Sequence, residues 1–265
     1  MYIPPYIIIV STFMRITFLI TIILLCVFPS IAQIVLHSHN DYEQARPIYT
    51  AIEQGFTSLE LDIILDGNRL VVSHDDKDLS QKEELEFYLK RIFETYQNKA
   101  SLWLLIDIKD YRPKVLQQLH QLIDTYSPLF HTRKGNNEDD LITIILSGDI
   151  PRREIIEDQK WIYFFIDGRP EHLGQNFSSQ FMPLISTDFT KYSSWKGMGD
   201  FREKERRKIK ELIRRVQSEN KELRFWKTKD KQVVWEQLLH LGIRVIGTDQ
   251  VKELAAFIKD RNRKN

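Results

Sequence analysis

Cysteine is almost absent from this chain of 265 residues, since Cys26 is its only one. It lies in an apolar N-terminal segment, so the rest of the chain has no cysteine and cannot rely on disulfides. An excess of one charge is also lacking, because 38 Lys and Arg face 37 Asp and Glu. This balance gives no reason to expect a nucleic-acid partner. With 42% apolar residues, the chain is expected to be stabilised by a hydrophobic core.

Residues 1–32 differ from everything that follows. Arg15 is their only charged side chain, and a largely apolar stretch runs from Ile16 to Phe28. A positive start, an apolar run and small residues before a cut are typical of a secretory signal peptide. We predict that Met14 is the natural start and that cleavage follows Ala32.

Two alternatives exist for this segment. A membrane anchor would place Arg15 near the middle of the apolar stretch, which insertion disfavours. Cys26 could carry a lipid, but Leu25 precedes it where a small residue is expected. We therefore expect residues 33–265 to be exported to the periplasm or the extracellular space.

The exported part alternates strand patterns with helix patterns from end to end. Periodic apolar positions at three- and four-residue steps predict helices near 85–96, 115–126, 209–216 and 251–258. Such alternation favours parallel strands joined by right-handed crossovers, and eight units favour a TIM-like (β/α)8 barrel in a single domain. The eight predicted strands are Ile34–Leu36, Ser58–Leu65, Leu102–Asp107, Leu141–Leu146, Trp161–Ile166, Pro183–Thr187, Leu223–Trp226 and Arg244–Ile246.

An open doubly wound sheet is the alternative fold. It is disfavoured because no glycine-rich phosphate loop follows the first predicted strand. No Gly-, Pro- or Ser-rich linker divides residues 33–265. The stretch 200–220 is dense in Arg, Lys and Glu, and we interpret it as a solvated helix face. A basic surface that faces anionic lipid is the other interpretation.

Carboxylates gather at the ends of the second and third predicted strands. Glu60 and Asp62 are two residues apart, so they share one strand face, and Asp107 and Lys109 do the same. Catalytic residues of (β/α)8 barrels lie at the C-terminal ends of the strands. Hard divalent cations prefer oxygen ligands. We therefore predict that Glu60, Asp62, Asp107 and Asn40 bind one Ca²⁺ or Mg²⁺.

Two histidines follow strands at the same end of the predicted barrel. Cleaving a phosphodiester requires one group to take a proton from the nucleophile and another to protonate the leaving oxygen, and imidazole suits both tasks near neutral pH. We predict His39 as the base or nucleophile and His74 as the acid. Lys109 is predicted to bind the phosphate as a point charge.

These residues resemble the PI-PLC-like phosphodiesterase superfamily. His39-Asn40-Asp41-Tyr42 is similar to the His-Asn-Thr-Tyr of eukaryotic phosphoinositide phospholipases C, and Glu60-Leu61-Asp62 matches their Glu-Leu-Asp strand. The resemblance implies a catalytic His39, with Asn40, Glu60 and Asp62 as calcium ligands. It also implies a second catalytic histidine about fifteen residues after the glutamate, and His74 follows Glu60 by fourteen.

Glycerophosphodiester phosphodiesterases give a second resemblance, because they carry Glu-x-Asp, Asp-Gly and His-Asp in this order. The corresponding residues here are Glu60-Leu61-Asp62, Asp66-Gly67 and His74-Asp75, with weaker matches at Trp226-Lys227-Thr228 and Thr248-Asp249. Asp107-Ile108-Lys109 resembles the Asp-Leu-Lys of spider-type sphingomyelinases D, which implies a metal-binding Asp107 and a phosphate-binding Lys109.

The chain also departs from those relatives. Asn40 stands where glycerophosphodiesterases have Arg. The resemblance therefore does not establish that this chain takes their usual glycerol-phosphate substrate. His37 is a rival to His39 for the first catalytic position, and we favour His39 because Asn40 follows it directly.

Together these features predict a metal-dependent phosphodiesterase of lipid metabolism that cleaves a glycerophosphodiester or a phospholipid headgroup phosphodiester. Trp226 is predicted to contact the leaving-group side of the substrate. We expect a monomer and allow for peripheral membrane contact. The alternatives are a non-catalytic protein that binds phosphorylated ligands, and a different metal-dependent phosphoric ester hydrolase on the same barrel. The choice between a hydrolysed and a cyclic product stays open.

Overall fold

The structure is a computed structural model that describes residues 33–96, 101–127, 129–135 and 142–264. The predicted signal peptide, its start at Met14 and its cleavage after Ala32 lie outside the described residues. Within those residues, no helix is both long enough and apolar enough to cross a membrane.

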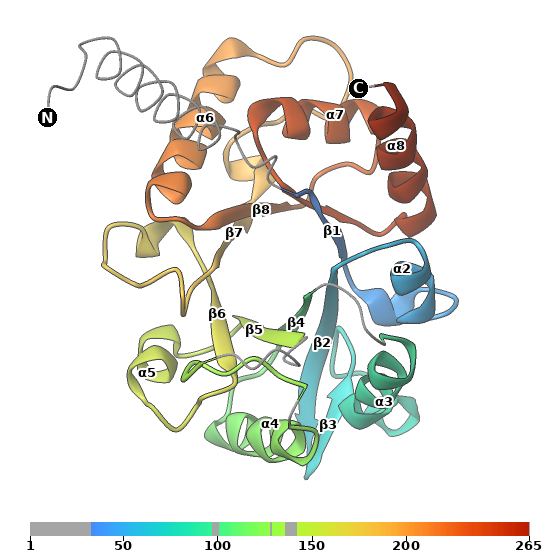
Figure 1. The fold of residues 1–265 in the computed structure, drawn as a ribbon, viewed down its shortest axis with the longest axis vertical. Coiled ribbons are helices and arrows are strands. Elements are labelled where there is room, and N and C mark those ends of the chain that lie inside the picture. Colours follow the sequence, from blue (N-terminus) through green and yellow to red (C-terminus); the bar gives the residue numbers. More distant parts are fainter. Residues whose placement is uncertain (1–32, 97–100, 128, 136–141, 265) are drawn as a thin grey trace, which may run out of the picture. The chain divides into compact units, whose positions relative to one another are not determined.

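Eight parallel strands close into a barrel, as predicted (Figure 1). The ring closes because the first strand pairs with both the last and the second. A ninth strand, β3 (Arg69–Val72), lies antiparallel beside the second and outside the ring. The parallel strands are β1 (Val35–Ser38), β2 (Ser58–Asp66), β4 (Leu102–Ile108), β5 (Ile142–Gly148), β6 (Phe164–Gly168), β7 (Leu184–Asp188), β8 (Glu222–Trp226) and β9 (Val245–Thr248).

Helices surround this barrel (Figure 1). All four helices expected from the apolar periodicity are present. The α-helices are α2 (Tyr49–Glu53), α3 (Leu85–Thr95), α4 (Pro113–Thr125), α5 (Arg152–Glu157), α6 (Glu203–Ser218), α7 (Gln232–Leu241) and α8 (Val251–Lys264). Short 3-10 helices are η1 (Asp41–Glu43), η2 (Leu79–Gln81), η3 (Pro170–His172) and η4 (Phe189–Lys191).

The β2–β3 hairpin was not predicted, and it decides where His74 lies. Strand β2 runs on to Asp66, and the chain turns at Gly67, whose φ of 61° suits glycine. Strand β3 then returns along β2, so that the Ser73 amide donates to the Asp62 carbonyl at 3.1 Å. The hairpin therefore brings His74 back to the level of Asp62, at the end of the barrel strand.

Alternation along the strands separates two apolar layers. In β2, Leu59, Leu61 and Ile63 face the helices and join the main core. A smaller cluster fills the barrel interior below the polar residues at its mouth. That inner cluster consists of Leu105, Ile145, Leu184 and Val245, with Val35, Trp103 and Phe165 packed against it.

The loop after β1 depends on one buried carboxylate. Asp41 accepts a hydrogen bond of 2.6 Å from the Ser38 hydroxyl and one of 2.5 Å from the Ile48 amide. Ile48 has a φ of 72°, which is strained for a β-branched residue. Asp41 therefore ties the end of β1 to the start of α2, and fixes the segment that carries His39 and Asn40.

We predict that Asp41→Ala lowers the free energy of unfolding by about 1–3 kcal/mol, because it leaves the buried Ile48 amide without an acceptor. Urea unfolding followed by circular dichroism measures the change. Glu43→Ala, at an exposed position of the same loop, is the matched control and should shift stability by no more than about 0.5 kcal/mol. Equal effects of the two substitutions would contradict this role of Asp41.

Candidate active site

The two histidines at the end of β1 have different surroundings. His37 is 1% exposed and lies inside the barrel, where its Nε2 donates to Glu60 at 2.8 Å and its Nδ1 accepts from the Ser58 hydroxyl at 2.8 Å. Burial and the positive charge of Arg224 lower the pKa of His37 to about 4, although the bond to Glu60 opposes them. His37 is therefore neutral, and both of its ring nitrogens are engaged.

His39 lies two residues further on, at the mouth of the barrel. Its Nδ1 is 2.7 Å from Asp249, which follows β9. Burial alone would lower the pKa of His39, but the bond to Asp249 and the charge of Glu60 raise it. Because Asp249 accepts from Nδ1, Nε2 is left for contact with a ligand. The structure thus favours His39 over His37 as the histidine that can meet a substrate.

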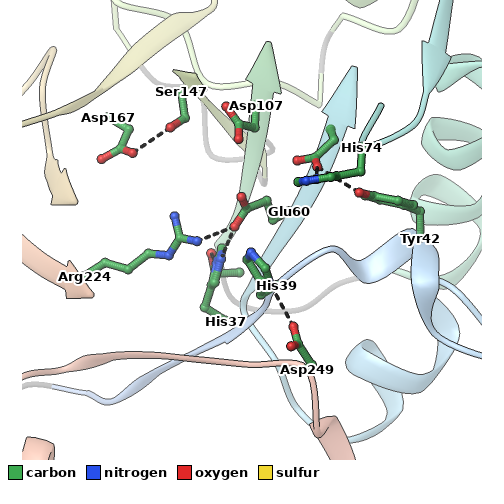
Figure 2. A network of polar contacts seen from close by, with 12 residues as sticks. His37, His39, Tyr42, Glu60, His74, Asp107, Ser147, Asp167, Arg224 and Asp249 are labelled. Carbon is green, nitrogen blue, oxygen red and sulfur yellow. Dashed lines mark hydrogen bonds and ion pairs between the residues drawn. The ribbon is translucent and has the colours of Figure 1, made fainter. Parts of the chain in front are cut away.

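Glu60 is buried, at 4% exposure, and is held by two partners. Arg224 from β8 and His37 from β1 both donate to its Oε2 (Figure 2). Burial alone would raise the pKa of Glu60, but Arg224 and the His37 hydrogen bond hold it well below the usual range. Glu60 is therefore ionised although it is enclosed by protein.

Asp62 is fully buried, and its Oδ2 is the meeting point of three side chains. The Tyr42 hydroxyl and His74 Nδ1 each lie 2.8 Å from it, and Lys109 Nζ lies 2.9 Å away. As with His39, a carboxylate fixes the ring through Nδ1, which leaves Nε2 of His74 free for chemistry. His74 itself is 64% exposed.

Asp107 completes the acidic group from the neighbouring strand. Its Oδ2 accepts a bond of 2.8 Å from Lys109. Burial raises the pKa of Asp107, although Lys109 opposes this shift. Its Oδ1 lies against the backbone of Gly148, where an added Cβ would come within 2.0 Å of that oxygen. Glycine at position 148 is therefore required for Asp107 to take this place.

The predicted ligands fit a hard divalent cation. Oxygen atoms of Glu60, Asp62 and Asp107 lie within 4.8 Å of one another. Oδ1 of Asn40, of Asp62 and of Asp107 is buried and finds no hydrogen-bond partner among the described residues. Such oxygens are disfavoured unless something satisfies them, and a set made only of oxygens suits Ca²⁺ or Mg²⁺. Asn40 itself has a left-handed backbone conformation, with φ of 45°.

A cavity of about 490 Å³ opens above these groups, and His39, His74 and Lys109 line it. This volume lies within the range of small-molecule sites. Trp226 also lines the cavity, as expected for a substrate contact, but its ring is covered by Arg169, whose Cζ lies 4.9 Å from the ring centroid. Arg169 is anchored by Asp167 at 2.6 Å. That wall therefore presents a guanidinium beside the indole.

Several residues of the site were not predicted as such. Arg224 shares the inner face of β8 with Trp226, and a charged residue inside a predicted apolar strand was a usable signal for it. Asp249 was noted only as part of a weak motif, and nothing in the sequence paired it with His39 across 210 residues. Tyr42 and Gly148 act through contacts that only the folded chain defines.

The chain is similar in sequence and in fold to known proteins. Residues 27–99 match the family model of the AIM6-like phosphodiesterase domain. This region holds His39, Asn40, Glu60, Asp62 and His74, but not Asp107 or Lys109. A curated relative, altered inheritance of mitochondria protein 6 homolog of Arthroderma benhamiae, is 25% identical over 276 residues, which covers 86% of this chain and 84% of the relative.

Solved structures of glycerophosphodiester phosphodiesterases share the fold. The protein from Parabacteroides distasonis has a TM-score of 0.61 at 15% identity, covering 87% of this chain and 100% of its own. The protein from Agrobacterium tumefaciens has a TM-score of 0.55 at 12% identity, covering 86% of this chain and 100% of its own. The predicted resemblance to a phosphodiesterase family is confirmed by the family model over residues 27–99, and the solved structures show that the fold is shared.

The buried neutral His37 predicts how stability depends on pH. Its pKa is about 4 in the folded chain and near 6.5 in the unfolded chain. The stability that neutral His37 contributes is therefore complete above pH 6.5 and is lost as the pH falls towards 4. The free energy of unfolding should fall by up to roughly 3 kcal/mol from this group over that interval.

Urea unfolding at a series of pH values measures this fall, which should be smaller in His37→Gln. His240→Gln, which changes an exposed histidine on α7, should follow the wild type. A His37→Gln variant with the same pH dependence as the wild type would show that His37 does not titrate in this way.

Proposed function

We propose that this chain is a metal-dependent phosphodiesterase that cleaves a glycerophosphodiester or a phospholipid headgroup phosphodiester. The observation that carries the proposal is the pair of histidines on one cavity. His39 and His74 are each oriented through Nδ1 by a carboxylate and each keep Nε2 for proton transfer. A protein that only binds phosphate has no need for two such groups.

Glu60, Asp62, Asp107 and Asn40 would hold one Ca²⁺ or Mg²⁺. When bound, this cation would supply positive charge to polarise a phosphoryl oxygen and to offset the charge that develops at phosphorus. In each of the three carboxylates, one oxygen accepts a hydrogen bond from a side chain of the protein, and the other oxygen is available to the cation. Arg224 and His37 take Oε2 of Glu60, and Lys109 takes Oδ2 of both Asp62 and Asp107.

Proton transfer is assigned to the two histidines. His39 removes a proton from the attacking hydroxyl or water, or attacks phosphorus itself, while Asp249 stabilises the imidazolium that forms. His74 protonates the leaving oxygen, and Asp62 fixes the orientation of its ring. Lys109, at the cavity wall, holds the phosphate by its charge. Trp226, with Arg169 on its ring, would contact the leaving-group side of the substrate.

We also propose where the enzyme acts and what it contacts. Export through the signal peptide would place the enzyme in the periplasm or outside the cell, where it would act in lipid metabolism as a monomer. Its partners would be phosphodiester substrates and, at times, a membrane surface, but not nucleic acid.

Turnover of bis(p-nitrophenyl) phosphate by chain 33–265 tests the proposal. We expect chelator to abolish release of nitrophenol and added Ca²⁺ or Mg²⁺ to restore it. His39→Ala and His74→Ala should each lower kcat by about 10²–10⁴-fold, the usual contribution of a general acid or base. A panel of glycerophosphodiesters, with a phosphomonoester for comparison, then separates diesterase from monoesterase activity.

His240→Ala removes a histidine outside the cavity and should leave kcat unchanged. Near wild-type turnover in folded His39→Ala or His74→Ala would contradict the assignment of that residue. Tight phosphodiester binding in calorimetry, without product from any substrate or metal, would favour the non-catalytic binding protein instead.

A further inference from the structure

The loop Trp195–Phe201, between η4 and α6, is built to present its tip to solvent. Trp195 stacks on Phe201 with ring centroids 4.9 Å apart, and its Nε1 donates to the Gly199 carbonyl at 3.1 Å. Gly197 and Gly199 have φ angles of 81° and 64°, which close the turn. The base of the loop is thus fixed, while the side chain of Met198 at its tip is left 75% exposed.

A second exposed apolar side chain lies against this loop. Val233, the second residue of α7, is 45% exposed. The backbone of Gly197 is packed so closely on α7 that a Cβ there would come within 3.1 Å of Val233 Cγ1. Met198 and Val233 are the large hydrophobic residues found exposed in the described parts of the chain. Because exposed apolar patches mark interaction sites, the proximity of Met198 and Val233 indicates a candidate contact surface.

Exposed lysines lie in the same two segments of the chain as these residues, in the loop itself and just before α7. We define the rim surface as Met198 and Val233 together with the exposed lysines Lys196, Lys227, Lys229 and Lys231. Lys231 Nζ reaches the Lys196 carbonyl at 3.4 Å, which joins the two loops. Lys227 pairs with Asp188 at 2.7 Å. In the portion of the chain that the structure describes, the other three lysines form no ion pair with a carboxylate, although Asp200 and Asp230 lie in the same two segments, so three positive charges are not neutralised by direct contact.

The rim surface borders the mouth of the cavity. The segment between β8 and α7 supplies both, because Lys227, Thr228 and Asp230 line the cavity while Lys229 and Lys231 belong to the rim. A flat anionic layer in contact with the rim surface would therefore lie next to the opening through which a substrate enters.

We propose that the rim surface docks onto an anionic lipid bilayer, with Met198 and Val233 in the headgroup layer and the lysines on the lipid phosphates. Apolar side chains ringed by cations are the combination that binds such an interface. The inference builds on the proposed function in one respect, since it supposes that the substrate lies in that surface. Docking itself can be measured without any turnover.

The basic face of α6 is the competing surface, and the structure favours the rim. Arg207 is paired with Glu203 at 3.2 Å, and Arg214 is paired with Glu211. The groove lined by this face includes Lys208 and Lys210 but brings no exposed large apolar residue. Charge alone would make it a weaker and more salt-sensitive site than the rim surface.

Flotation with vesicles tests the proposal. Chain 33–265 contains every strand of the closed barrel and its core, so it can be used without the N-terminal segment. We expect it to float with vesicles of phosphatidylcholine and phosphatidylglycerol, and much less with phosphatidylcholine alone. Met198→Asp and Lys229→Glu should each lower the partition coefficient about tenfold or more, because each puts a negative charge at the interface.

Lys208→Glu, the same charge change on α6, is the matched control and should bind nearly as the wild type does. Met198→Asp should also keep wild-type turnover of the soluble diester, since it lies outside the catalytic groups. Absence of flotation with anionic vesicles would overturn the proposal, and so would Met198→Asp that floats as well as the wild type. An equal loss in Lys208→Glu would assign docking to α6. Flotation without turnover on any substrate would leave docking intact and count against the proposed function alone.

Discussion

Three carboxylates enclosed at the mouth of one barrel are the constraint on which this structure depends. Glu60, Asp62 and Asp107 are close enough to repel one another. Two cations partly neutralise them: Arg224 donates to one oxygen of Glu60, and Lys109 donates to one oxygen of Asp62 and one of Asp107. This arrangement compensates only part of the negative charge, and it leaves inward-facing oxygens that suit a divalent cation. The chemistry proposed for the site follows from that incomplete compensation.

Closure of the barrel brings the compensating cations to the carboxylates. Arg224 and Glu60 are 164 residues apart in the chain, and they meet because β8 and β2 face one interior. His39 meets Asp249 because β1 pairs with β9. The antiparallel return of β3 brings His74 to Asp62 within one hairpin. Each catalytic candidate is thus oriented by a residue that a different strand supplies, and the same barrel end carries the loops of the rim surface.

The fold and the acidic group were predictable from the sequence, because both depend on local patterns. Strand alternation placed Glu60 and Asp62 on one face, and eight strand patterns predicted the barrel. The partners of these residues were not predictable, because spacing cannot reveal which side chains meet across a closed ring. Arg224 stood out as a charge in an apolar strand, but nothing in the sequence paired it with Glu60. The β2–β3 hairpin was missed because β3 is a short run next to a longer strand. The sequence favoured His39 over His37 for the first catalytic position, and in the structure His39 lines the cavity whereas His37 is buried inside the barrel.

Metal binding can be measured on the chain itself and shows whether these carboxylates form a cation site. Calorimetric titration of chelator-treated chain 33–265 with Ca²⁺ and with Mg²⁺ measures stoichiometry and affinity without any substrate. We expect one site per chain, lost in Asp107→Asn and retained in Asp110→Asn, which changes an exposed carboxylate close by in the sequence. If neither Ca²⁺ nor Mg²⁺ binds, or if Asp107→Asn binds the cation as tightly as the wild type, these carboxylates do not form the expected metal site.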